Sequence, residues 1–122
     1  MDVRRILRVS EAIRVELSEI IGFEMDDPRL ATVDVTLVQV SPDSRHAVIK
    51  IASKGTEPQQ NQVLAALEHA SGYLRRELAS RLQLRHVPEL HFEHDKNPEA
   101  DSRIDFLLRR AKKSRPRDEK QP

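Results

Sequence analysis

The sequence predicts an α+β fold in which a three-stranded sheet is covered on one face by helices. Apolar residues recur every three or four positions in some segments and every second position in others, and β-branched residues concentrate in two short stretches. The 122 residues correspond to one domain. We expect residues 1–112 to form that domain, with a helix after the third strand, and residues 113–122 to be a basic, disordered tail.

The first predicted helix runs from Val3 to Phe23, where apolar residues recur on one helical face. It ends before Asp27-Pro28, because proline biases the preceding residue toward extended geometry. Residues 32–40 are rich in β-branched side chains and predict a central strand. After a turn at residues 41–44, every second residue from 47 to 51 is apolar, which predicts a second strand in a hairpin with the first.

A second helical region begins at Thr56, which forms a capping-box pattern with Gln59. One helix from residue 57 to residue 82 would be about 39 Å long, which is too long for a domain of this size. Ala70-Ser71-Gly72 therefore predicts a kink, with Gly72 in a left-handed or strained conformation. The alternative is one continuous helix in which Gly72 is tolerated at a tight helix contact.

Residues 89–94 have Leu90 and Phe92 on one face between polar residues and predict the third strand. The rule of right-handed crossovers predicts that this strand lies beside the first strand and parallel to it. A final helix is predicted to open at Asn97-Pro98. The longest apolar run, residues 63–67, is far below the roughly 20 residues that span a bilayer, and the N-terminus lacks the apolar block of a signal peptide. We therefore expect a cytoplasmic protein.

Catalytic and metal-binding patterns are missing from the sequence. Without cysteine there is no disulfide, thiolate nucleophile or cysteine-bound zinc, and no nucleotide-binding or protease motif occurs. His91 and His94 are three apart on a strand and point to opposite faces, so neither a metal site nor a cofactor is predicted. Asp26 and Asp27 precede Pro28, and this arrangement is typical of a turn, where aspartate forms hydrogen bonds with the backbone. The chain is predicted not to be an enzyme, and a small hydrolase built on Asp26, Asp27, His94 and Asp95 with a divalent ion is a competing hypothesis.

The net charge of +1 is unevenly distributed along the chain. Residues 101–122 hold eight basic and four acidic side chains, whereas residues 1–100 have a net charge of −3. A basic end of this kind is typical of chains that bind nucleic acid, and the alternative is a solvated end that only aids solubility. Aromatic residues make up only 3%, so recognition would depend on phosphate charge and RNA shape rather than on base stacking.

Arginines lie in the first helix and around the predicted kink, where they could bind phosphates. A helix that begins after the kink would also direct its N–H groups toward a phosphate. The alternative for any single arginine is an ion pair with Glu11, Glu68 or Glu77 on a solvated helix face. A module that binds a protein partner through its helical face, without RNA, is a further alternative. The residues predicted to contact RNA are Arg4, Arg5, Arg8, Ser71, Gly72, Arg75, Arg76, Arg81 and Arg85.

Several separated motifs resemble the ribosome-binding factor A family, from Arg4 to about Leu108. The resemblance implies a K-homology-like fold of the second type, in which Ala70-Ser71-Gly72 replaces the usual Gly-x-x-Gly loop. The motifs that carry it are residues 70–79, residues 84–95, Asp27-Pro28-Arg29-Leu30, Val40-Ser41-Pro42-Asp43 and Arg103-Ile104-Asp105.

The same resemblance implies a function. Members of this family bind the immature small ribosomal subunit and its ribosomal RNA, promote processing of the 5′ end of that RNA and support growth in the cold. They are not themselves enzymes, and a ribosome-associated GTPase is implicated in their release. We expect this chain to act as a monomer whose partner is the small ribosomal subunit, with no membrane and no cofactor involved.

Overall fold

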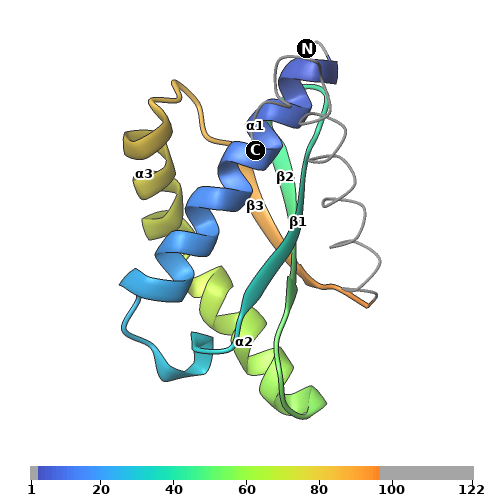
Figure 1. Ribbon diagram of the computed structural model, residues 1–122, viewed down its shortest axis with the longest axis vertical. Helices are drawn as coiled ribbons and strands as arrows, with labels where there is room; N and C mark the ends of the chain where they lie inside the picture. Colours follow the sequence, from blue (N-terminus) through green and yellow to red (C-terminus); the bar gives the residue numbers. More distant parts are fainter. Residues whose placement is uncertain (1–2, 97–122) are drawn as a thin grey trace, which may run out of the picture.

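A computed structural model describes residues 3–96 and has the predicted α+β architecture (Figure 1). The order of helices and strands is confirmed, as is the break in the second helical region. The predicted helix that opens at Asn97 and the predicted tail at residues 113–122 lie outside the described residues. The elements are α1 (Val3–Glu19), the π-helical turn η1 (Ile20–Glu24), the short 3-10 helix η2 (Pro28–Leu30), β1 (Asp34–Val40), β2 (His46–Ala52), α2 (Glu57–His69), α3 (Ser71–Leu82) and β3 (Glu89–His94).

Helix α1 packs on the sheet through the apolar face that its sequence predicts. Ile13 and Leu17 are completely buried, and the π-helical turn η1 continues the same buried row with Ile20. The buried Ser10 hydroxyl accepts a hydrogen bond of 3.2 Å from the backbone N–H of Val40, which ties the helix to the end of β1. The orientation of α1 is therefore set by both apolar burial and one buried polar contact.

The sheet has the order β1-β2-β3, with β2 in the centre. Strands β1 and β2 pair antiparallel, whereas β3 pairs parallel with β2, so that His46 lies opposite Glu89 and Val48 opposite His91. The prediction that the third strand lies beside the first is therefore wrong. The crossover through α2 and α3 starts from β2, so the crossover rule makes β3 parallel to β2 rather than to β1.

The break between α2 and α3 falls at Ala70, whose backbone angles are φ −90° and ψ 3°. The predicted kink is therefore confirmed, and so is the Thr56 capping box with Gln59. The predicted conformation of Gly72 is wrong: Gly72 is the second residue of α3, and Gly55 is the glycine with a positive φ among the described residues. Ala70 makes the bend in the bridge region, which an L-residue can adopt, so no glycine is needed there.

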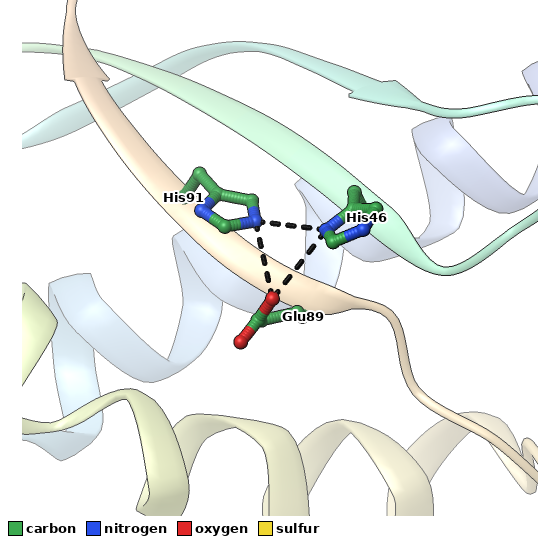
Figure 2. A group of neighbouring side chains, drawn as sticks. All are labelled: His46, Glu89 and His91. Atoms are coloured by element: carbon green, nitrogen blue, oxygen red, sulfur yellow. Dashed lines mark hydrogen bonds and ion pairs between the residues drawn. The ribbon is translucent and has the colours of Figure 1, made fainter.

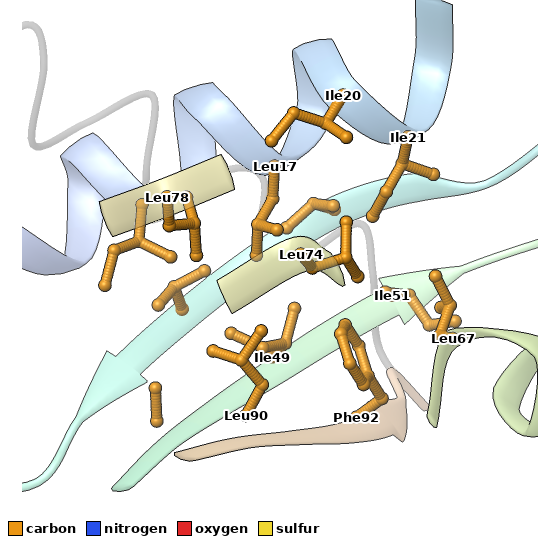
Figure 3. Close-up of a cluster of buried hydrophobic side chains, with 14 of the residues drawn as sticks. Leu17, Ile20, Ile21, Ile49, Ile51, Leu67, Leu74, Leu78, Leu90 and Phe92 are labelled. Carbon is orange, nitrogen blue, oxygen red and sulfur yellow. The ribbon is translucent and has the colours of Figure 1, made fainter. Parts of the chain in front are cut away.

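The hydrophobic core lies between the three helices and one face of the sheet (Figure 3). Because residues alternate along a strand, the opposite face carries the polar set, including His46 and His91. No helix within residues 3–96 is long and apolar enough to cross a membrane. The core side chains that Figure 3 labels are Leu17, Ile20, Ile21, Ile49, Ile51, Leu67, Leu74, Leu78, Leu90 and Phe92.

Candidate nucleic-acid interface

The N-terminal half of α1 exposes three of the predicted arginines. Arg4, Arg5 and Arg8 are all exposed to solvent, whereas Ile13 and Leu17 of the same helix are completely buried. Arg5 and Arg8 form no ion pair with any residue in the described range 3–96. Their charges are therefore not compensated locally by the folded part of the chain, which is the condition for attracting an external polyanion.

The start of α3 combines an uncapped helix end with an exposed arginine. Ala70 precedes α3 and supplies no side-chain cap, so within the described structure no side chain caps the first-turn N–H groups of the helix. Gly72 and Arg76 are exposed one turn apart, and a Cβ built on Gly72 would lie 3.8 Å from Nη1 of Arg76. A helix N-terminus and a guanidinium group in one place favour the same ligand, an anion.

Arg75 connects α3 to the segment that leads into β3. Its Nη2 donates a hydrogen bond of 2.9 Å to the carbonyl oxygen of Val87, although Arg75 is an exposed residue. Gln83 ends α3 in a left-handed conformation, with φ 52° and ψ 42°. Arg85 is exposed in this connecting segment, which Arg75 holds back against the helix. Arg75 therefore contributes both a charge at the surface and the placement of a second arginine.

Arg81 differs from the other predicted arginines because it is surrounded by carboxylates. Its guanidinium group pairs with Glu24, Glu77 and Glu16, which joins α3 to α1 and to η1. The hydrogen bond with Glu24 raises the pKa of Arg81 and lowers the pKa of the Glu24 carboxyl. For Arg81 the structure therefore shows the alternative that the sequence leaves open, an ion pair with glutamate, and its charge is largely compensated.

The four residues of the hydrolase hypothesis take part in separate local structures. Asp26 and Asp27 line a shallow hollow of about 300 Å³ beside η1 and η2, whose lining does not include His94 or Asp95. Asp27 caps η2 and accepts a bond of 2.7 Å from Nη2 of Arg29, which holds the pKa of Asp27 below its usual value. These contacts account for Asp27 as a turn residue, as the sequence predicts.

His94 is the last residue of β3, and Asp95 follows it directly. Asp95 is buried and accepts a bond of 2.5 Å from the hydroxyl of Thr36 on β1. His91 and His94 lie on opposite faces of β3, in agreement with the prediction. Sequence reasoning missed His46, which the pairing of β2 with β3 brings to His91; only the correct strand order could have found this contact.

Comparisons with known proteins agree with the motif resemblance. A family model described as ribosome-binding factor A matches residues 5–108. A curated relative named ribosome-binding factor A, from Solibacter usitatus (strain Ellin6076), is 72% identical over 119 residues, which cover 98% of this chain and 97% of the relative.

Two sets of coordinates of Thermus thermophilus ribosome-binding factor A are also similar. The crystal structure of that factor gives a TM-score of 0.66 at 27% identity and covers 73% of this chain and 94% of that one. A homology model of the Thermus thermophilus factor, fitted into a cryo-EM map of its complex with the 30S subunit, gives 0.53 at 27% identity and covers 67% and 90%. The predicted K-homology-like fold is confirmed.

Proposed function

The chain belongs to the ribosome-binding factor A family, and from this premise we propose that it binds the immature small ribosomal subunit through its ribosomal RNA. We further propose that it assists late maturation of the subunit, including 5′-end processing of that RNA, and supports growth in the cold. The observation that carries the RNA contact is the exposed Arg76 beside Gly72 at the uncapped start of α3. The Thermus thermophilus relative fitted into a map of a 30S complex supports the choice of subunit.

Arginines spread over a rigid surface can favour one RNA conformation without changing any covalent bond. Each guanidinium group neutralises a phosphate only where the RNA backbone follows the protein surface, so the protein selects the matching fold of the RNA. Arg5 and Arg8 on α1, together with Arg76 and Arg85, supply charges that no described carboxylate compensates. We propose that occupying this site also delays use of an unfinished subunit.

The proposal makes the chain a binding factor and not an enzyme. We propose that it acts as a monomer in the cytoplasm, without a cofactor, and that a ribosome-associated GTPase promotes its release. Purified protein incubated with precursor ribosomal RNA should leave the RNA intact. Cleavage that co-purifies with the protein and is lost in His94→Ala would instead support the hydrolase hypothesis.

Co-sedimentation with immature small subunits, with large subunits as the comparison, tests the proposal directly. If about six phosphates are neutralised, affinity should fall by about three orders of magnitude between 50 and 200 mM salt, by analogy with duplex DNA. Arg76→Gln and Arg8→Gln should each lower the slope of log affinity against log salt by about 1. Arg29→Gln is the matched control, because Asp27 already compensates its charge.

A salt-independent association would contradict the RNA contact. It would favour the alternative in which the helical face docks a protein partner, since such contacts depend less on counterion release. Equal loss of binding in Arg29→Gln and Arg76→Gln would show that net charge alone, rather than the surface at the start of α3, determines binding.

A further inference from the structure

Three side chains from two strands meet on the face of the sheet opposite α1, α2 and α3 (Figure 2). His46 is the first residue of β2, and Glu89 is the first residue of β3, directly opposite it in the parallel register. His91 follows Glu89 by two positions, so its side chain emerges on the same face. Among residues 3–96 this is the one group of three or more potential ligand side chains whose donor atoms converge.

The distances between the three donor atoms are close to those around a tetrahedral zinc ion. Nδ1 of His46 lies 3.0 Å from Nε2 of His91, and Oε1 of Glu89 lies 3.4 Å from the first nitrogen and 3.5 Å from the second. Zinc bonds to nitrogen and oxygen are about 2.0–2.2 Å long, which places two ligand atoms of a tetrahedral site about 3.3–3.5 Å apart. An ion could therefore bind all three atoms after shifts of a few tenths of an ångström.

We propose that His46, Glu89 and His91 form a binding site for a divalent transition-metal ion of the zinc class, with one coordination position left open to solvent. Two imidazole nitrogens and one carboxylate oxygen suit zinc and exclude a preference for Mg²⁺, which takes oxygen ligands. The three side chains are 53%, 59% and 47% exposed, so a water molecule can reach the fourth position. Binding selects the tautomers in which the two facing ring nitrogens carry no proton.

The backbone around the cluster holds the two strand ends in place before any ion binds. The Ser41 N–H donates to the carbonyl oxygen of His46 at 2.8 Å, and the His46 N–H donates to the Ser41 hydroxyl at 3.1 Å. On the other strand, the Glu89 N–H donates to the carbonyl oxygen of Arg45 at 2.8 Å. Little chain ordering is then required on binding, which favours affinity. A bound ion would link the beginnings of β2 and β3.

Titration of the full chain, freed of metal by a chelator and carrying no histidine tag, tests the site. Calorimetry with Zn²⁺ should give one ion per chain, and Co²⁺ should develop the visible absorption typical of tetrahedral coordination. His46→Ala, His91→Ala and Glu89→Gln should each weaken Zn²⁺ binding by about tenfold or more, since even partners that only orient a ligand contribute that much. Mg²⁺ at the same concentrations should not bind.

Matched controls come from residues of the same types outside the cluster. Glu93→Gln removes a carboxylate from the same strand, and His86→Ala removes an exposed histidine from the segment before it. Both should bind Zn²⁺ like the wild type. Zn²⁺ should also raise the melting temperature of the wild type and of both controls, but not that of His91→Ala, because an ion that binds only the native state stabilises it.

Several results would overturn the proposal. These are the lack of saturable Zn²⁺ binding, equal binding by all variants, or equal binding of Mg²⁺. If an alanine variant melts at a lower temperature than the wild type without metal, the conservative His91→Gln takes its place in every measurement. The titrations use the free protein and no ribosomal subunits, so their outcome is independent of the proposed function.

Discussion

Replacing Gly72 with alanine distinguishes the effect of this residue on protein stability from its effect on the RNA contact proposed for the start of α3. Gly72 is the second residue of α3 and is exposed, and an added Cβ would meet only Nη1 of Arg76, at an ordinary contact distance of 3.8 Å. The bend itself is made by Ala70. Alanine is therefore compatible with both the space and the backbone at this position, and it lowers the conformational entropy of the unfolded chain.

The expected effect on the free energy of unfolding is a gain of up to about 1 kcal/mol, the difference between glycine and alanine inside a helix. For a domain of this size that corresponds to an increase of up to about 4–8 °C in the melting temperature. Gly55→Ala is the matched control with the opposite sign. Gly55 has φ 113°, and a Cβ there would overlap Oε1 of Gln59, the atom that accepts a hydrogen bond from the Thr56 N–H in the capping box. That variant should lose about 1 kcal/mol or more.

Thermal melts of wild type, Gly72→Ala and Gly55→Ala, followed by circular dichroism, measure the effect of each substitution on stability. Co-sedimentation of Gly72→Ala with immature small subunits measures its effect on binding. If RNA approaches the Gly72 backbone closely, the variant should bind more weakly although it is more stable. A lower melting temperature for Gly72→Ala would refute the reasoning, because it would mean that Gly72 has a conformation or a neighbour that alanine cannot accept.

Three other outcomes follow from particular contacts. Thr36→Val removes the hydroxyl that donates to buried Asp95 and should cost about 1–3 kcal/mol in urea denaturation, whereas an unchanged midpoint would mean that this bond is dispensable. Arg81 lowers the pKa of the Glu24 carboxyl. Their pairing therefore stabilises the fold at a pH above the ordinary glutamate pKa, and this stabilisation is lost as the pH falls through the lowered pKa. On acidification, the melting temperature of Glu24→Gln should therefore fall less than that of the wild type. Deleting residues 113–122 removes four basic and two acidic side chains and should lower the salt slope of subunit binding without changing the thermal melt, and an unchanged slope would exclude the tail from the RNA contact.

The features that sequence can predict are those encoded by neighbouring residues. The third strand is predicted at residues 89–94, where the structure has it, because alternation needs only a few adjacent positions. The capping box involves only the residues from Thr56 to Gln59, and the helix break follows from length and composition. Which residue of Ala70–Gly72 makes the bend is not predictable, because Ala70 adopts a conformation that its residue type does not indicate.

Arg81 shows which features of the candidate site cannot be predicted from neighbouring residues in the sequence. Its position on the helix suggests a phosphate ligand, but Glu24, which lies 57 positions earlier in the chain, pairs with it. Only the packing of α3 against α1 and η1 brings these charges together. By contrast, Arg76 lies one turn after Gly72 on the same helix, and this relation follows from sequence spacing alone.

The strand order decides whether His46 and His91, on the sheet face opposite α1, α2 and α3, can meet. With β3 beside β1, as the sequence predicts, β2 and β3 would be two strand spacings apart, about 9.6 Å, and His46 could not contact His91. With β3 beside β2, the same two side chains approach to 3.0 Å and Glu89 joins them. Comparing only histidines on one strand therefore overlooks a metal site that a parallel pairing creates between two strands. The zinc titration is thus also a functional test of the β2–β3 register, because a shift of one residue would move His91 to the opposite face and abolish the site.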